Sequence, residues 1–419
     1  PESSIEPVDM ESLADVEVAD ETAAEAIAKT VVIKLNGGLG TSMGMDRAKS
    51  LLCVRRGLSF LDIIARQVLH LRQQHRATLP LIFMNSFRTS GDTMAAVARY
   101  EDLAVEGLPL EFLQNKEPKL LAKDLSPVSW PKDPDLEWCP PGHGDLYTAL
   151  RGTGLLDQMI EAGYRYVFVS NSDNLGAVPD PRVAGWFASS GAPFAIEAVR
   201  RTASDRKGGH FARRKSDGRL VLRETAQTLD EDKAALGDLD RHRYCSTNNL
   251  WFDLQAMKDA LDQREGILGL PLIKNVKNVD PGDASSPKVV QVETAMGAAI
   301  EVFEGARLIE VGRDRFVPVK TTNDLLVLRS DVYAIGSDFV LDQEAEQVPY
   351  VELDETYYKL VGEFDKRFPE GAPSLKRAER LTIEGDVTFG GLQFRVIDTA
   401  GLEEADAATL TGRMRMQTE

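Results

Sequence analysis

The sequence is poor in the residues that build metal clusters and disulfide frameworks. Its 419 residues contain only three cysteines and five histidines. Cys53, Cys139 and Cys245 lie far apart and match neither a zinc spacing nor a disulfide pattern. The histidines include no His-x-x-x-His pair, which excludes a zinc-peptidase motif. We therefore expect three free thiols.

Long apolar runs and a surplus of basic residues are also missing. No stretch approaches the ~18 apolar residues of a membrane span, and residues 1–28 do not show the basic-then-apolar order of a signal peptide. The net charge is −17, and nine of the acids lie in residues 1–28, which contain no Lys or Arg. The rest of the chain, from residue 29 on, is only mildly acidic, which argues against nucleic-acid and membrane partners. We expect a cytoplasmic protein.

What the chain does contain is an alternation of strand-like and helix-like patterns. A β-branched run at 30–35 has strand length, and short apolar runs recur at 79–84, 110–113, 166–169, 194–199, 220–222 and 250–252. Apolar residues at helical spacing occupy 61–71 and 90–100. This alternation predicts an α/β fold whose mostly parallel sheet is covered on both faces. Ligands in such folds bind beyond the carboxyl ends of the strands.

The chain divides by composition into three regions. Residues 1–29 form an acidic arm that could be helical in part, residues 30–340 carry the α/β alternation, and residues 341–419 differ in character. Within the second region, 115–141 contains six prolines, so we expect a long loop with a function. In the third, 381–390 alternates apolar and polar residues with glycine at the turns, as one rung of a β-helix would.

A glycine-rich loop follows the first predicted strand. Residues 36–44 contain four glycines, whose backbone N–H groups can approach a phosphate closely. The loop matches neither the Walker A motif nor the dinucleotide fingerprint. Lys49 adds a cation suited to a triphosphate. A structural turn followed by a solvated lysine explains the same residues.

Two further segments offer groups for phosphate and metal. Residues 138–147 combine a rigid Pro-Pro, two glycines and His143, which can donate to a phosphate or sugar oxygen. Asp145 in the same segment could instead cap a helix. Asp173 follows the apolar run at 166–169, where a carboxylate can hold Mg²⁺ or simply form a turn.

Three more segments place polar residues near strands or helices. The segments 207–210, 223–227 and 247–249 offer groups that suit sugar hydroxyls, or are solvated loops. Lys320 precedes a predicted helix at 325–328. Because the helix dipole disfavours a cation there, Lys320 suggests a bound anion nearby; a solvated lysine is the alternative.

Together these motifs resemble the eukaryotic-type UTP–glucose-1-phosphate uridylyltransferases, also called UDP-glucose pyrophosphorylases. The resemblance covers about residues 30–340, and its motifs occur in the order of the family. They are Leu35–Gly44 with Lys49-Ser50, Met84–Phe87, Trp138–Asp145, Ser170–Gly176, Thr247–Trp251 and Pro318–Asp324.

The resemblance implies a fold and a reaction. The fold is a Rossmann-like, mixed and mostly parallel sheet of the nucleotide-diphospho-sugar transferase type, with a small C-terminal region that starts a left-handed β-helix. This region could support a homo-oligomer. The reaction is the Mg²⁺-dependent conversion of UTP and glucose 1-phosphate to UDP-glucose and pyrophosphate, by in-line attack on the α-phosphorus of UTP.

The resemblance also implies roles for individual residues. Lys49, Lys320 and Asp173 are expected to be catalytic, with Asp173 on the metal. The expected nucleotide-binding residues are Leu35, Asn36, Gly37, Gly38, Gly40, Met84, Gln114, Gly142 and His143. The expected sugar-phosphate-binding residues are His143, Asn171, Gly209, Glu224, Asn248 and Lys320.

The sequence departs from the family pattern at three places. Residues 45–50 read Met-Asp-Arg-Ala-Lys-Ser, Ser172 replaces an isoleucine, and Cys245-Ser246 replaces Phe-Asn beside the expected sugar residues. A UDP-N-acetylhexosamine or broad UDP-sugar pyrophosphorylase is therefore the alternative function. A nicotinamide oxidoreductase would need the missing dinucleotide fingerprint. A non-catalytic nucleotide sensor would release no pyrophosphate.

Overall fold

The computed structural model describes residues 1–202, 205–206, 208–225, 228–390 and 413–415. The chain forms two units, each with its own internal contacts. Unit 1 comprises residues 1–37, 71–171 and 179–315, and unit 2 comprises residues 38–70, 172–178 and 316–419. The chain thus passes from one unit to the other at five points.

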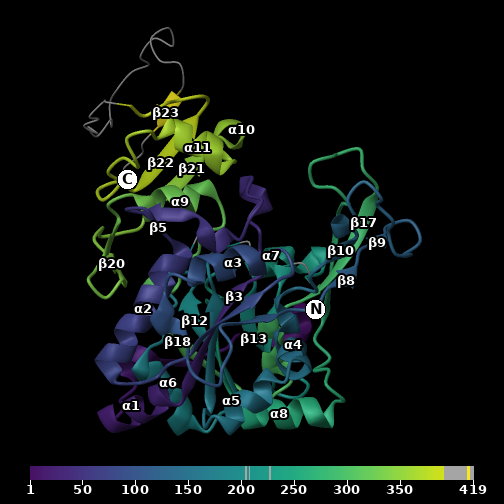
Figure 1. The fold of residues 1–419 in the computed structure, drawn as a ribbon, viewed down its shortest axis with the longest axis vertical. Coiled ribbons are helices and arrows are strands. Elements are labelled where there is room, and N and C mark those ends of the chain that lie inside the picture. Colours follow the sequence, from purple (N-terminus) through teal and green to yellow (C-terminus); the bar gives the residue numbers. More distant parts are fainter. Residues whose placement is uncertain (203–204, 207, 226–227, 391–412, 416–419) are drawn as a thin grey trace. The chain divides into compact units, whose positions relative to one another are not determined.

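Unit 1 is built on an eight-stranded sheet (Figure 1). Its order is β2 (Glu11–Ser12), β18 (Arg307–Glu310), β12 (Phe194–Arg200), β15 (Tyr244–Asp253), β11 (Tyr166–Asn171), β3 (Thr30–Asn36), β6 (Leu81–Asn85) and β7 (Glu111–Leu113). Every neighbouring pair is parallel except the two made by β15. The predicted mixed, mostly parallel sheet is confirmed.

The strand predicted at 220–222 belongs elsewhere. It forms β14 (Leu220–Arg223) in a small antiparallel sheet with β13 (His210–Arg214) and β1 (Ile5–Glu6). A short apolar run predicts a strand but does not specify the sheet to which the strand belongs. Val221 is buried against Ile5 and Ala212 in a small separate cluster, which buries its side chain as well as the central core would.

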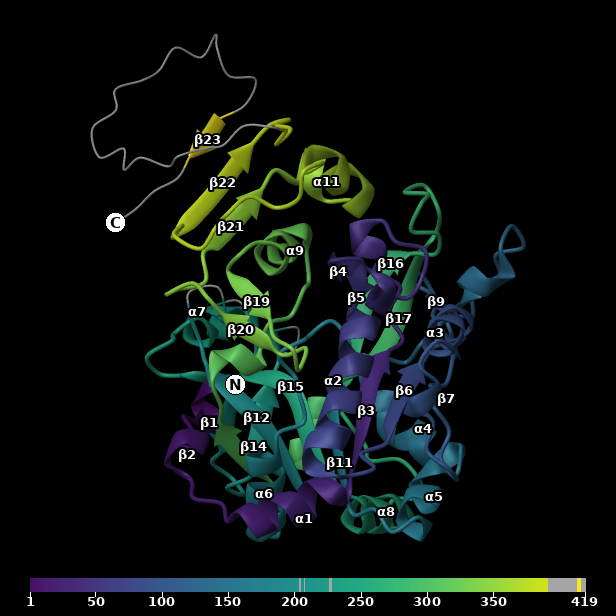
Figure 2. The same ribbon diagram turned by 60° about the vertical axis from the view of Figure 1, so that its left-hand side comes forward.

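Helices cover the central sheet of unit 1. Figure 2 shows α1 (Asp20–Ala28) beside α6 (Pro181–Ser190), and α4 (Leu146–Gly152), α5 (Leu155–Glu161) and α8 (Leu254–Gln263) grouped together. The central strands are buried on both faces: Val31, Val32 and Ile33 of β3 have no exposed surface. This is the burial that continuous β-branched runs predict for parallel strands. The remaining helices of this unit are α3 (Ser90–Val97) and α7 (Lys233–Leu236).

The acidic N-terminal residues are part of unit 1. Ala23, Ala26 and Ile27 of α1 are buried. The Glu2 carboxylate forms ion pairs with Arg223 and Arg241, and its Oε1 lies 2.9 Å from His242 Nε2. The acidic charge of this segment is therefore partly neutralised by basic groups of the same unit.

The proline-rich residues 115–141 contain only short strands and one 3₁₀ helix at Pro134–Glu137, as their composition predicts. The strands are β8 (Glu117–Pro118), β9 (Leu120–Leu121) and β10 (Trp138–Cys139). A second small sheet has the order β16 (Leu272–Asn278), β17 (Lys288–Thr294) and β9, so β16 is its edge.

Unit 2 combines two hairpins, a small sheet and short helices. Its hairpins are β4 (Cys53–Arg55) with β5 (Leu58–Ser59), and β19 (Tyr333–Ile335) with β20 (Leu341–Gln343). The helix α2 (Phe60–His75) begins in this unit, and α9 (Thr322–Arg329), α10 (Glu355–Tyr358) and α11 (Val361–Arg367) follow. The rings of Phe364, Phe368 and Phe389 pack as one cluster.

The C-terminal sheet of unit 2 consists of β21 (Tyr350–Leu353), β22 (Arg380–Glu384) and β23 (Arg413–Arg415). β22 is parallel to β21 but antiparallel to β23. A β-helix stacks its rungs in parallel, so the described strands do not establish one. Most of the remaining C-terminal segment, 391–412, lies outside the described residues.

Two predictions from composition can be compared with the structure. The three cysteines are free thiols, with Cys53 exposed and Cys139 and Cys245 buried, as expected. Among the described residues, no helix has the length and apolar character needed to cross a membrane.

Candidate functional site

The end of β3 and the start of the glycine-rich loop lie beside two other predicted nucleotide-binding residues. Leu35 pairs in register with Met84 on β6. A Cβ atom on Gly37 would lie 2.9 Å from the Nε2 atom of Gln114, so the bare glycine backbone allows the Gln114 amide to lie against it. The structure thus brings Leu35, Gly37, Met84 and Gln114 to one edge of the sheet in unit 1.

Asn36 turns its side chain into the protein. Its Nδ2 atom donates to Asn85 Oδ1 and to Thr93 Oγ1, both at 2.8 Å, and the residue is buried. Only the backbone of Asn36 is left for a ligand. This agrees with an expected cradle of backbone groups rather than side chains.

The segment that contains Gly142 and His143 is tied to the neighbourhood of Gln114. The Asp145 carboxylate accepts hydrogen bonds from the backbone N of Asn115 at 2.6 Å and from its Nδ2 at 2.8 Å. Its side chain makes no capping hydrogen bond to α4, which corrects the interpretation of Asp145 as a helix cap. Asp145 instead connects two loops that both carry predicted nucleotide-binding residues.

His143 is held as a neutral hydrogen-bond donor. Its Nδ1 atom accepts the backbone N–H of Met296 at 3.0 Å, which places the ring proton on Nε2. Burial lowers the pKa of His143 to about 4. At neutral pH the ring can therefore donate its Nε2–H to a phosphate oxygen without carrying a charge of its own.

Glycine is required on both sides of His143. Gly142 has a φ of +81°, and a Cβ there would lie 2.6 Å from the carbonyl oxygen of Thr294. A Cβ on Gly144 would lie 2.3 Å from Thr294 Oγ1. The loop packs against β17 so closely that no side chain fits, and this contact sets the position of His143.

Three of the predicted sugar-binding residues of unit 1 lie next to strand ends, and the fourth, Asn248, lies within β15. Asn171 ends β11 and pairs in register with Leu35 on β3. Gly209 and Glu224 lie together, because a Cβ on Gly209 would be 2.9 Å from Glu224 Oε2. Asn248 lies on β15 with a left-handed φ of +58°, and its backbone N donates to Ser246 Oγ at 3.0 Å.

One expectation about this group is wrong. Both amides of Thr247–Asn249 were expected to suit sugar hydroxyls, but Asn249 is completely buried and its Nδ2 donates to Glu197 Oε2 at 3.0 Å. Asn248 remains partly exposed. Of these two adjacent amides, therefore, only that of Asn248 can face a ligand.

In unit 2 the structure places two of the three expected catalytic residues in contact. The Lys49 ammonium lies 2.6 Å from Asp173 Oδ2 and also donates to the carbonyl oxygen of Val319. The backbone N of Lys49 donates to Gly38 O at 3.1 Å. Gly40 has a φ of +66°, and a Cβ there would press on the stem of Lys49 at 3.3 Å. The glycine-rich loop therefore shapes the position of the Lys49 ammonium.

Asp173 is also connected to the segment that precedes Lys320. Val319 N donates to Asp173 O at 3.1 Å, and Val317 N donates to Asn174 Oδ1 at 2.9 Å. These hydrogen bonds use backbone groups and the Asn174 amide, so apolar periodicity in the sequence could not have revealed this pairing. Lys49, Asp173 and the 317–319 segment form a single local structure.

Lys320 itself is exposed, directly before α9. Its backbone N donates to Asp324 Oδ2 at 2.8 Å, and Asp324 forms a capping box with Thr321. Asp324 thus supplies the negative charge that the helix dipole favours, so the position of Lys320 does not by itself require a bound anion. Among the described residues its ammonium has no ion-pair partner.

The carboxylates of the described residues do not form an enclosed metal site. No group of three His, Cys, Asp or Glu side chains converges in the part of the chain that the structure describes. Asp173 is a single, partly exposed carboxylate. This fits Mg²⁺, which is often bound through one or two carboxylates and completes its shell with water and substrate phosphates.

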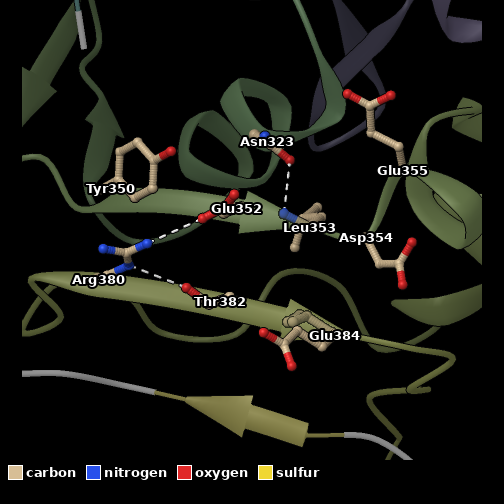
Figure 3. A pocket seen from close by; sticks show the side chains of 10 residues that line it. Asn323, Tyr350, Glu352, Leu353, Asp354, Glu355, Arg380, Thr382 and Glu384 are labelled. Atoms are coloured by element: carbon tan, nitrogen blue, oxygen red, sulfur yellow. Dashed lines mark hydrogen bonds and ion pairs between the residues drawn. The ribbon is translucent and has the colours of Figure 1, made fainter.

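A hollow elsewhere in unit 2 does not coincide with these residues. It has a volume of about 520 Å³ and lies over β21 and β22 (Figure 3). Arg380 in its wall pairs with Glu352 at 3.1 Å and donates to Thr382. None of the expected site residues lines it, so the chemistry predicted from the sequence lies outside this hollow.

Comparison with known proteins gives a consistent result. The family described as UTP–glucose-1-phosphate uridylyltransferase matches residues 1–394. The UTP–glucose-1-phosphate uridylyltransferase of Pyrus pyrifolia is 38% identical over 387 residues, which cover 91% of this chain and 79% of that protein. The probable enzyme of the same name from Schizosaccharomyces pombe is 37% identical, with 86% and 71% covered.

Solved structures agree. The UDP-glucose phosphorylase of Trypanosoma brucei has a TM-score of 0.86 at 42% identity and covers 92% of this chain and 83% of its own. A variant of Leishmania major UDP-glucose pyrophosphorylase in complex with UDP-glucose has a TM-score of 0.85 at 44% identity, with 93% and 84% covered. The fold, the matched length and the placement of the motifs all lead to one conclusion: this chain belongs to the UTP–glucose-1-phosphate uridylyltransferase family.

Proposed function

We propose that this chain makes UDP-glucose and pyrophosphate from UTP and glucose 1-phosphate, with Mg²⁺, through the residues described above. The observation that carries the assignment of residues is the contact between Lys49 and Asp173, 2.6 Å apart beside the glycine-rich loop. This contact supports the proposal, because phosphoryl transfer uses a cation and a carboxylate that can hold a metal ion close to the same phosphates.

The reaction needs no protein nucleophile. A phosphate oxygen of glucose 1-phosphate attacks the α-phosphorus of UTP, the new P–O bond forms, and the bond to the β-phosphate oxygen breaks as pyrophosphate leaves. Catalysis then rests on alignment of the two substrates and on stabilisation of the charge that spreads over the phosphate oxygens.

Residues of unit 1 serve recognition in this proposal. The Gln114 amide and the backbone of Gly37 offer donors and acceptors that suit the edge of a uracil ring. The Nε2–H of neutral His143 donates to a phosphate oxygen. Asn171, Gly209, Glu224 and Asn248 serve the sugar phosphate.

Residues of unit 2 serve charge stabilisation. Mg²⁺, when bound at Asp173, neutralises charge on the substrate phosphates. In the free chain the ion pair with Asp173 and the bond to Val319 O hold the Lys49 ammonium in a fixed position. Such a cation is oriented before the triphosphate arrives, which is the condition under which electrostatic stabilisation is most effective.

One contact favours a second candidate function, in which the enzyme accepts several sugar 1-phosphates. Ser246 Oγ accepts from the backbone N of Asn248 at 3.0 Å, at a position where the family has a larger asparagine. A smaller side chain there leaves more room beside Asn248. A broad UDP-sugar pyrophosphorylase is therefore the second candidate.

The test is a pyrophosphate-release assay in which UTP, dTTP and ATP are crossed with a panel of sugar 1-phosphates, with Mg²⁺ or with a chelator. We expect release with UTP and glucose 1-phosphate only when Mg²⁺ is present. Asp173→Ala should abolish turnover while the fold survives, because it removes an oxygen ligand and no core volume. Asp342→Ala, which alters an exposed carboxylate of the same unit, is the matched control.

Two outcomes would contradict the proposal. No release across the whole panel with Mg²⁺ would refute the catalytic role. Normal activity of Asp173→Ala would place the metal elsewhere.

A cytoplasmic location and assembly through residues 341–419 stay predictions, to be checked by cell fractionation and by sedimentation of the full chain.

A further inference from the structure

Glu197 is a buried carboxylate that the proposed reaction does not use. It lies on β12 with no exposed surface. Arg315 binds it through two hydrogen bonds, Nε to Oε2 and Nη2 to Oε1, both at 2.7 Å. Trp251 Nε1 donates to Oε1 at 2.9 Å, and Asn249 Nδ2 donates to Oε2 at 3.0 Å. Burying a carboxylate is costly unless it is paired in this way.

The sheet is irregular at the position of Glu197. Ile196 pairs with Leu250 and Ala198 pairs with Ser246, so three residues of β15 lie opposite Glu197 alone. These residues are Thr247, Asn248 and Asn249. The middle one, Asn248, has the left-handed φ of +58°, which is unfavourable for a residue with a side chain. Bulges of this kind redirect a side chain out of the regular alternation.

Glu197 holds both neighbours of Asn248. Thr247 Oγ1 donates to the carbonyl oxygen of Glu197 at 2.7 Å, on the N-terminal side of Asn248. On its C-terminal side, Asn249 is bound to the Glu197 carboxylate. Because the residues before and after Asn248 are fixed to one residue of the adjacent strand, the conformation of Asn248 is fixed as well.

We propose that Glu197 is a positioning residue for sugar recognition, which holds the bulge that presents the Asn248 amide. This inference rests on the proposed function, because the contact between Asn248 and the hexose is part of that function. Arg315 serves it indirectly by holding the Glu197 carboxylate in place through two hydrogen bonds. Glu197 itself contacts neither substrate.

The test compares the binding of UDP-glucose with that of UDP, by calorimetry, in the full chain. Thr247→Val keeps the shape of the side chain and removes two hydrogen bonds of the bulge, the one that Thr247 Oγ1 donates to Glu197 O and the one that it accepts from Asn249 N at 3.1 Å. We expect it to weaken UDP-glucose binding roughly 10-fold, because these two hydrogen bonds are lost, and to leave UDP binding unchanged. Glu197→Gln should have a larger effect in the same direction.

Further variants make the result decisive. Asn248→Ala should weaken UDP-glucose binding selectively if the proposed function is right. Glu310→Gln alters another carboxylate that pairs with β12, through Arg200 at 2.7 Å, and should change neither affinity. Glu197→Gln removes the charge that Arg315 binds at 2.7 Å and leaves Asp180, 3.9 Å away, as a more distant partner, so this variant could fail to fold. In that case Asn249→Ala, which removes the amide bound to the Glu197 carboxylate, decides together with Thr247→Val.

The outcomes separate the two claims. If Asn248→Ala acts on the sugar while Thr247→Val does not, the positioning role is wrong and the proposed function stands. If Asn248→Ala has no effect, the sugar contact and the inference built on it both fail. If Thr247→Val and Glu197→Gln weaken UDP and UDP-glucose equally, Glu197 is merely structural and the inference is overturned.

Discussion

The tight packing of the His143 loop predicts the effect of adding one methyl group to Gly144. A Cβ there would lie 2.3 Å from Thr294 Oγ1, 2.7 Å from Thr294 Cβ and 2.8 Å from its backbone carbon. Rotation of the threonine side chain would relieve only the first contact. Thr294 N also donates to Pro141 O at 2.9 Å, which holds the loop against β17. The backbone must therefore move.

The size of the loss in the free energy of unfolding depends on how many of these close contacts cannot relax. Overpacking that forces a backbone shift costs typically 1–3 kcal/mol, and we expect Gly144→Ala to lower the free energy of unfolding by about that amount. His143 is the adjacent residue, so its Nε2–H moves with the loop. A displacement of about 1 Å in a positioning group can cost ~10²-fold in rate, which we expect in kcat/KM for UTP.

The assay is urea unfolding combined with steady-state kinetics, with Gly152→Ala as the matched control. Gly152 ends α4, and a Cβ there meets nothing within 4 Å. That variant should keep its activity and gain up to about 1 kcal/mol in stability. Adding Thr294→Gly to Gly144→Ala removes the two nearest contacts and should restore part of the loss. If Gly144→Ala behaves like Gly152→Ala, the loop is not confined as we describe.

Three other predictions concern separate parts of the chain. Lys320→Ala should lower kcat by roughly 10²–10³ with a smaller change in KM for UTP, and Lys320→Arg should rescue only partly; a rise in KM alone would make it a simple binding contact. Changing Cys245 and Ser246 together to Phe and Asn should shift the preference among sugar 1-phosphates, by up to a few kcal/mol, more than the preference among nucleotides; a change confined to UTP would show that the sugar site is misplaced. Burial opposes ionisation of Glu2, but hydrogen bonds from His242 and the neighbouring arginines outweigh it and lower its pKa from 4.5 to about 2. Its stabilisation is therefore present above pH 4.5 and lost as the pH falls towards 2, and Glu2→Gln should flatten the urea stability profile across that window.

Six of the eight strands of the central sheet could be predicted, because each contains a short apolar run, whereas β2 (Glu11–Ser12) and β18 (Arg307–Glu310) were missed because they are too short or too polar. The run at β3 is mostly β-branched and apolar, which is typical of a parallel strand buried on both sides. The direction of β15 could not be predicted, since an apolar run is the same pattern in either direction. β16 and β17 were missed because residues 272–278 alternate weakly and remain largely exposed, so the sequence carries little apolar periodicity there.

The sequence motifs located the loops of the candidate site, but the orientation of individual side chains could not be predicted from them. Glycines after a strand and polar residues at strand ends identified the loops that matter. Which of two adjacent asparagines faces outward depends on a bulge, and that bulge depends on Glu197, 52 residues before Asn249. Pairing over such a distance leaves no local pattern in the chain. The contact between Lys49 and Asp173 is equally remote in sequence.

The edge strand β16 has a consequence for the behaviour of the protein in concentrated solution. One side of its backbone is unpaired within its sheet, and Leu272 and Val276 are 70% and 56% exposed. Such an edge is a template on which a strand of another molecule can add. Lys274 lies between these two residues on the same face, so two copies that approach edge to edge bring like charges together. Colloidal stability at this edge therefore depends in part on Lys274, which is flanked by apolar side chains, and it should weaken as rising salt screens that charge.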